Sequence, residues 1–127
     1  MLGTADLVAF VPTTNPKRAR AFYQETLELD FVSEDKFALV FESNGVTIRI
    51  ANVSGVAHKP AAFTILGWTV PDVATTVRGL LKKGVLFERY EGMNQDALGI
   101  WKSPSGAKVA WFKDPDSNVL SVTEIAE

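Results

Sequence analysis

Apolar and polar positions follow one another along the first half of the chain in an order that predicts a strand, a helix and three more strands. The apolar run Leu7–Val11 predicts a buried strand that ends at Pro12. Asn15 and Pro16 supply a helix cap and a first-turn proline, so a helix is expected over 16–27. The strands expected after this helix lie at about 29–34, 37–42 and 46–52.

The second half repeats this order. Residues 63–70 form a β-rich run, and Pro71-Asp72 opens a second helix that Lys82-Lys83-Gly84 closes. The expected strands that follow lie at about 85–90, 107–113 and 119–124, with a short extended piece near 100–102. The pattern is an internal repeat of roughly 55–60 residues, the size of a half-domain.

A sheet with a helix on one face needs a partner for the other face, so the two halves are expected to share one domain. We predict an α+β fold in which two tandem βαβββ modules form a concave, partly closed mixed sheet with the helices on its outer face. The expected boundaries are a single domain over 1–127, with module one at about 5–52, a linker at about 53–62 and module two at about 63–125.

Composition narrows the function classes. The formal net charge is −2 and the Lys and Arg residues are scattered, which argues against a nucleic-acid or membrane-surface binder. The chain has no cysteine, so disulfides, thiolate nucleophiles and Cys-ligated zinc are excluded. With one histidine there is no Ser-His-Asp set, and no phosphate-binding or dinucleotide glycine motif is present. No secretory leader or membrane-length apolar run is found, so a cytoplasmic protein is expected.

Four short motifs, in order and spread over nearly the whole chain, resemble the vicinal-oxygen-chelate superfamily, the glyoxalase/bleomycin-resistance/dioxygenase family. They are Arg20–Tyr23, Gly67–Val73, Lys82–Val85 and Phe112–Asn118. Ser117 departs from the family, whose final hairpin usually has glycine there, and a little backbone strain is expected.

The resemblance implies where a divalent metal would be held, by His, Gln or Glu side chains on the first and last strand of each module. In this sequence those positions fall on Asp6, Arg49, Ile65 and Ser121. Only the aspartate is a good ligand, and arginine cannot be deprotonated to become one. We therefore expect no metal and no other cofactor.

The same positions remain candidates for binding a ligand, together with Trp111. Asp6 and Arg49 either pair as part of a site for an anionic or carbonyl group, or form a plain solvent-accessible pair. Trp111 is either a flat wall for a planar ligand or core. Trp101 either roofs the pocket or covers a dimer edge, and the lone His58 in the linker is interpreted as a surface residue.

The leading hypothesis is a metal-independent protein that binds a small organic molecule in the concave cavity. The alternative is a glyoxalase-like lyase or isomerase, or a dioxygenase, with an atypical metal site or acid/base residues such as Glu88 and Tyr90. A third interpretation is an interaction domain whose cavity is vestigial. The resemblance also implies a homodimer; no nucleic-acid or membrane partner is expected.

Overall fold

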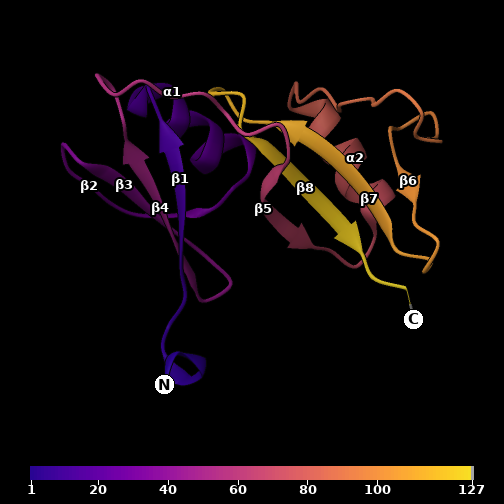
Figure 1. The fold of residues 1–127 in the computed structure, drawn as a ribbon, viewed down its shortest axis with the longest axis horizontal. Helices are drawn as coiled ribbons and strands as arrows, with labels where there is room; N and C mark the ends of the chain where they lie inside the picture. Colours follow the sequence, from indigo (N-terminus) through magenta and orange to yellow (C-terminus); the bar gives the residue numbers. More distant parts are fainter. Residues whose placement is uncertain (127) are drawn as a thin grey trace. The chain divides into compact units, whose positions relative to one another are not determined.

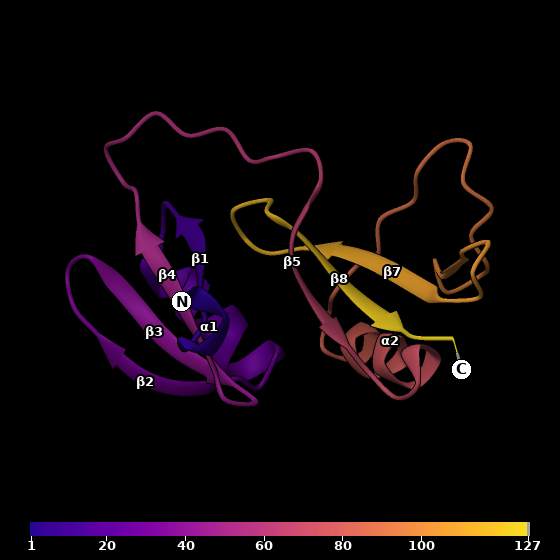
Figure 2. The same ribbon diagram turned by 60° about the horizontal axis from the view of Figure 1, so that its bottom comes forward.

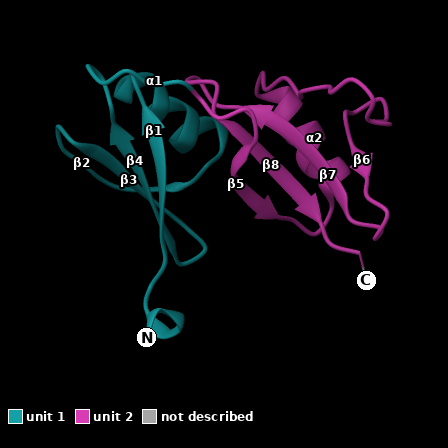
Figure 3. Cartoon of the chain, in the orientation of Figure 1, with its two compact units in different colours: residues 1–59 teal, residues 60–127 magenta. Residues whose placement is uncertain are grey.

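The computed structural model describes residues 1–126 (Figure 1); Glu127, the last residue of the predicted domain, lies outside them. The chain divides into two compact units, Met1–Lys59 and Pro60–Glu127 (Figure 3). The division falls inside the segment 53–62 that the sequence predicts as a linker. Each unit contains one four-stranded sheet and one α-helix.

Unit 1 begins with a short 3₁₀ turn, η1, and then follows the predicted order (Figures 1 and 2). Its strands lie in the order β1-β4-β3-β2, with β1 parallel to β4 and the other pairs antiparallel. The elements are η1 (Leu2–Thr4), β1 (Val8–Thr13), α1 (Pro16–Ala21), the π-helical turn η2 (Phe22–Thr26), β2 (Asp30–Glu34), β3 (Ala38–Ser43) and β4 (Val46–Asn52).

The predicted helix 16–27 is present but changes character along its length. The Asn15 side chain accepts a hydrogen bond from the Arg18 amide at 3.2 Å, and Pro16 occupies the first turn. From Phe22 the helix continues as a π-turn. The Tyr23 side chain on this turn is fully buried, and its ring lies 6.1 Å from that of Phe41 on β3.

The first strand does not end at Pro12, as the sequence suggests, but continues to Thr13. The order of the sheet explains why the proline is tolerated. β1 is an edge strand that pairs only with β4, so one side of it needs no amide donor.

Unit 2 repeats the arrangement, with strand order β5-β8-β7-β6 and β5 parallel to β8. Asp72 caps its helix by accepting a hydrogen bond from the Thr75 amide at 3.2 Å. Gly84, with φ +90°, follows the helix in the left-handed conformation that glycine favours. The elements are β5 (Thr64–Thr69), α2 (Val73–Lys82), β6 (Trp101–Lys102), β7 (Lys108–Lys113) and β8 (Val119–Glu124).

The prediction of a strand at 85–90 is wrong. This segment makes one isolated bridge, Phe87 to Phe112, and one backbone hydrogen bond, from the Glu88 amide to the Trp111 carbonyl at 2.8 Å. Beyond Glu88 the chain leaves the sheet, because the backbone amide of Tyr90 bonds to the Gln95 side chain instead of to a neighbouring strand.

In each unit the middle strand alternates between two faces. Ile48 and Ile50 of β4 are buried on the side of unit 1 that α1 covers, and Leu120 and Val122 of β8 are buried in unit 2. The intervening residues of each strand point to the opposite side, which we call the open face. Arg49 lies on the open face of unit 1, and Trp111 and Ser121 lie on the open face of unit 2.

The turn between β7 and β8 is held by one carboxylate. Asp114 is buried and accepts hydrogen bonds from the Asp116 and Asn118 amides, each at 2.9 Å. Its second oxygen accepts from the Asn118 side chain at 2.8 Å. Ser117 has φ +67°, so the left-handed residue expected at this family position is present with a serine side chain.

These observations confirm the α+β class and the tandem βαβββ modules. The strands form two mixed sheets, and neither sheet closes into a barrel. Within residues 1–126, no helix has the length and the apolar character needed to cross a membrane.

Two glycine substitutions should change the stability of the protein in opposite directions, because an added side chain meets Ser121 at Gly67 and open space at Gly79. A Cβ at Gly67 would lie 2.6 Å from the Ser121 hydroxyl oxygen, whereas one at Gly79, within α2, would meet nothing within 4 Å. Gly67→Ala should lower the free energy of unfolding by about 1–3 kcal/mol. Gly79→Ala should raise it by about 1 kcal/mol. Chemical denaturation of both variants measures the two effects.

A double variant identifies the cause. Replacing Ser121 by alanine removes the hydroxyl, so Gly67→Ala/Ser121→Ala should recover most of the loss. If the double variant is as unstable as Gly67→Ala alone, the proposed clash is not responsible.

Candidate functional site

Arg49 lies in the middle of the open face of unit 1. Its register partners are Phe10 on β1 and Val40 on β3. Phe10 keeps 64% of its surface exposed although it is a large apolar residue. The arginine is partly buried, and its charge is one of the smaller influences that lower the pKa of Asp35, after hydrogen bonds from the Phe37 and Ala38 amides. An exposed apolar surface with a cation at its centre is therefore present in this unit.

Asp6 is not brought to Arg49. It is exposed and precedes β1, whereas the residue opposite Arg49 is Phe10, four positions further along. Four residues of extended chain span about 13 Å. The described residues accordingly contain no ion pair between the two side chains, and the paired arrangement considered from the sequence does not form.

Ser121 lies on the open face of unit 2 next to Gly67 and is 8% exposed. The remaining family position, Ile65, falls where the register of β5 against β8 shifts. The four side chains at the family's metal positions are thus a carboxylate, a guanidinium, an alkyl group and a hydroxyl. This donor set does not fit a divalent ion. Residues 1–126 contain no group of three or more metal-ligating His, Asp or Glu side chains.

Trp111 lines a pocket of about 250 Å³ on the open face of unit 2, which we call the Trp111 pocket. The Tyr90 ring stands edge-on to that of Trp111, at 5.5 Å and 79°. The Trp101 ring lies 6.1 Å away on another side, tilted by 36°. Trp111 is only partly buried, while Phe112, on the other face of β7, is fully buried. The residues that line the pocket are Ala62, Phe63, Thr64, Tyr90, Met93, Trp111 and Val119.

The loop that supplies Tyr90 and Met93 is held by the side chain of Gln95. Its amide oxygen accepts from the Tyr90 backbone at 2.8 Å, and its amide nitrogen donates to the Glu88 and Gly99 carbonyls at 2.9 and 2.8 Å. The hydrogen bonds of this one side chain satisfy backbone groups that a neighbouring strand would satisfy in a sheet.

Two charged side chains reinforce the same loop. The Arg89 guanidinium donates to the Asp96 and Ala97 carbonyls at 2.7 and 2.9 Å. The Asp96 carboxylate accepts from the Leu98 and Ile100 amides, each at 2.9 Å. The loop is therefore fixed by its own polar groups before any ligand binds.

Tyr90 stays protonated at neutral pH. Burial, and to a smaller extent the nearby Glu88 carboxylate, raise the pKa of its phenol. Glu88 in turn pairs with Lys113 at 3.5 Å. The Tyr90 hydroxyl is thus available as a neutral hydrogen-bond donor or acceptor.

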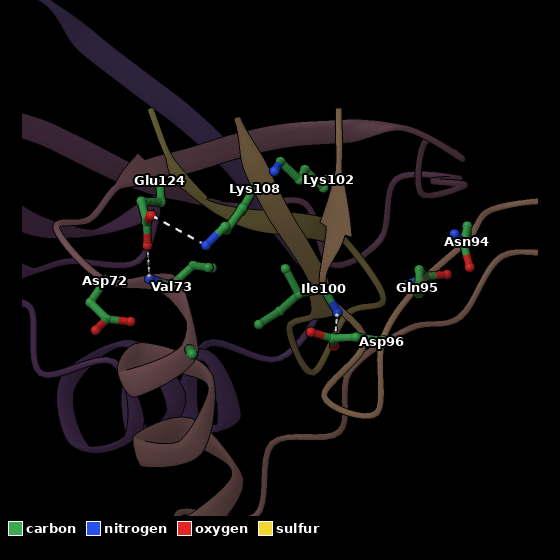
Figure 4. Close-up of a pocket in the computed structure, with 10 residues that line it drawn as sticks. Asp72, Val73, Asn94, Gln95, Asp96, Ile100, Lys102, Lys108 and Glu124 are labelled. Atoms are coloured by element: carbon green, nitrogen blue, oxygen red, sulfur yellow. Dashed lines mark hydrogen bonds and ion pairs between the residues drawn. The ribbon is translucent and has the colours of Figure 1, made fainter. Parts of the chain in front are cut away.

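A second pocket, of about 330 Å³, lies at the start of α2 on the opposite side of the same sheet (Figure 4). Its charged groups are largely engaged. Glu124 accepts from the Val73 amide at 3.0 Å and faces Lys108 at 3.8 Å, and Asp96 binds its own loop. Carboxylates already occupy the positive end of the α2 dipole, so this pocket does not offer an anion site.

The sequence named Trp111 as a candidate for ligand binding, whereas Tyr90, Met93 and Phe63 were not assigned to a ligand pocket. Tyr90 was considered only as a general acid or base in the predicted strand 85–90. Nothing in a strand pattern reveals that the side chain of Gln95, five residues later, accepts a hydrogen bond from the Tyr90 amide and draws the chain away from the sheet. The available signal was limited to an aromatic residue and a methionine three positions apart, Tyr90 and Met93. The Trp101 ring lies beside that of Trp111, but Trp101 does not line the Trp111 pocket. His58 is exposed, as expected.

Comparison with known proteins identifies one family. The sequence model of the Glyoxalase/Bleomycin resistance protein/Dioxygenase superfamily matches residues 5–122. No curated protein matches the sequence.

Solved structures are similar over nearly the whole chain. A member of this superfamily from Sphaerobacter thermophilus DSM 20745 has a TM-score of 0.77 and 19% identity, and 98% of this chain and 100% of that one are covered. TnmS3, an antibiotic binding protein from Streptomyces sp. CB03234, has a TM-score of 0.75 at 20% identity, with 99% of each chain covered. Lactoylglutathione lyase from Agrobacterium tumefaciens has a TM-score of 0.72 at 14% identity, with 95% of this chain and 93% of that one covered. At these identities the likeness establishes the fold alone.

The role of Gln95 can be tested against its neighbour. Gln95→Met removes three hydrogen bonds with little change in size, so the free energy of unfolding should fall by about 1–3 kcal/mol. Hydrogen exchange at the Tyr90 amide should become at least tenfold faster. Asn94→Met places the same residue at an exposed adjacent position and should change neither. Unchanged exchange at Tyr90 in Gln95→Met would show that the glutamine does not hold the loop.

Proposed function

The chain belongs to the Glyoxalase/Bleomycin resistance protein/Dioxygenase superfamily, and from that membership we propose that it binds a small organic molecule without a metal ion. The observation that carries the proposal is the Trp111 pocket. A concave apolar surface with aromatic walls and few polar groups is the usual form of a small-molecule site. The loop that carries Tyr90 and Met93 is held by Gln95 in the free protein, so little ordering entropy of this loop is lost on binding.

Metal independence is supported by the side chains at the family's ligand positions. Ile65 offers no donor atom, and Arg49 is a cation that would repel the ion. The affinity must then come from surface contact and from individual polar groups. With each unit taken by itself, we propose ligand contacts from Trp111 and Ser121 in unit 2, and from Arg49 and, separately, Asp6 in unit 1.

Arg49 is proposed to meet an anionic or carbonyl oxygen of the ligand. Its surroundings support this role, because Phe10 and Val40 exclude part of the water that would otherwise screen the guanidinium. Asp6 lies too far along the strand to neutralise it. The cation therefore keeps its charge available.

We propose that the protein works as a homodimer in the cytoplasm. The chain leaves several large apolar side chains exposed, more than isolated surface positions require. They include Val8, Phe10, Phe37, Phe63 and Leu86, which are 43–79% exposed. A second copy of the chain is the partner that would cover them. A protein without cysteine loses no disulfide in a reducing compartment.

Metal content is the direct test of the cofactor assignment. Elemental mass spectrometry of the purified protein, after dialysis against nickel, zinc, iron or manganese and then against buffer, should find no stoichiometric ion. One ion retained per chain would contradict metal independence. The enzymatic alternative, a lyase, isomerase or dioxygenase, would then become the leading hypothesis and would be tested by metal-dependent turnover of a hemithioacetal or a catechol.

Ligand binding can be followed by titrating aromatic and antibiotic-like compounds against tryptophan fluorescence. For a compound that binds through an anionic or carbonyl group, Arg49→Ala should weaken binding about 10-fold or more. Arg18→Ala, which removes an exposed arginine of α1, is the matched control and should bind as the wild type does. Equal binding by Arg49→Ala would remove Arg49 from the site, and a broad set of compounds with no binder would contradict the function itself.

A further inference from the structure

The lining of the Trp111 pocket indicates which class of molecule it accepts. We propose that this pocket binds a flat aromatic molecule of one or two fused rings that has no formal charge. The inference rests on the small-molecule-binding function proposed above and narrows its ligand.

The absence of charge in the lining is the first argument. All seven residues that line the pocket have uncharged side chains. The charged residues next to it are engaged elsewhere, since Lys113 pairs with Glu88 and Arg89 binds two loop carbonyls. An ionised group seated against this lining would lose part of its hydration without gaining a counterion. A neutral ligand avoids this cost.

The arrangement of the rings is the second argument. Trp111 and Tyr90 stand at 79° to each other and form a corner. A flat molecule stacked on either ring presents its edge to the other, so both preferred aromatic geometries are met at once. Met93 lies in the same lining, and its thioether is polarisable and adapts to an aromatic surface. A round or branched aliphatic ligand would use only part of this corner.

The size of the pocket limits the number of rings. Its volume, about 250 Å³, is below the lower end of the range of about 300–1,000 Å³ that holds drug-sized ligands. A single ring or a pair of fused rings suits it, and a longer fused system would extend into solvent.

Two hydroxyls supply the polar contacts. They belong to Thr64 and Tyr90, and the Trp111 indole N–H is a further donor in the lining. The Tyr90 phenol, whose pKa burial raises further above its ordinary value, is neutral at pH 7 and can donate to a carbonyl or amide oxygen. A carboxamide, ketone or phenol substituent therefore suits the pocket better than a carboxylate or an amine.

Two probes of the same shape test the charge argument. Naphthalene-2-carboxamide and naphthalene-2-carboxylate differ mainly in their charge at pH 7. Isothermal titration of the wild-type protein should show the carboxamide binding at least 10-fold more tightly. Trp111→Leu and Tyr90→Leu should each weaken carboxamide binding at least 10-fold. Circular dichroism verifies that each variant is folded, and two variants are used so that the test still holds if one of them does not fold.

Lys102→Ala is the matched control. Lys102 lines the pocket at the start of α2 and not the Trp111 pocket, so this variant should bind the carboxamide as the wild type does. If Trp111→Leu and Tyr90→Leu, both folded, bind the carboxamide normally, the location is wrong.

The remaining outcomes separate this inference from the function on which it rests. Tighter binding of the carboxylate, lost in Arg49→Ala, would overturn the neutral ligand class and leave small-molecule binding in place. Binding of neither naphthalene probe would also overturn the inference. The function would then be judged by the broader fluorescence titration described above.

Discussion

In each unit one inner strand of the sheet buries two aliphatic side chains on the face that the helix covers, and the positions of Arg49 and Ser121 depend on this. Ile48 and Ile50 are 2% and 0% exposed, and Leu120 and Val122 are 0% and 3% exposed. Burying such a side chain contributes about 1.5–3 kcal/mol. A slip of one residue in β4 would expose both isoleucines and bury Arg49, so the register is strongly fixed. Arg49 and Ser121 lie on the open faces because the aliphatic residues on either side of them in the strand are buried on the opposite face.

The same alternation explains how much of the fold was predictable from sequence. The aliphatic positions of β4 and β8 have a clear period of two, and the structure has both strands at their predicted bounds, 46–52 and 119–124. Local chemistry was equally informative where one residue decides the conformation. Asn44 and Gly45, an Asn-Gly pair between the two predicted strands, both have positive φ, which a tight β3–β4 hairpin turn requires.

Prediction was wrong where the outcome depends on a partner that is remote or specific. Pro12 looked like the end of a strand, but an edge strand does not need its missing amide. The segment 85–90 has the composition of a strand, yet the Gln95 side chain takes the hydrogen bond that a neighbouring strand would otherwise receive. The part of the Trp111 pocket that Tyr90 and Met93 form depends on the hydrogen bonds of this glutamine. For the same reason Trp111 was identified from its strand position, while Tyr90 and Met93 were not assigned to its pocket.

A pocket of this size also sets a limit on affinity. A two-ring ligand with a small substituent has about 13 non-hydrogen atoms, and at about 0.3–0.5 kcal/mol per atom its binding free energy is about −4 to −6.5 kcal/mol. This corresponds to a Kd between about 1 mM and about 20 μM. Without a metal ion, tighter binding requires more buried apolar surface. In the proposed homodimer, a second copy would bring further apolar surface to the pocket residue Phe63, which is 70% exposed in a single chain. On this argument the proposed dimer and the proposed ligand site are energetically linked, and ligand affinity should rise with protein concentration over the range in which the dimer forms.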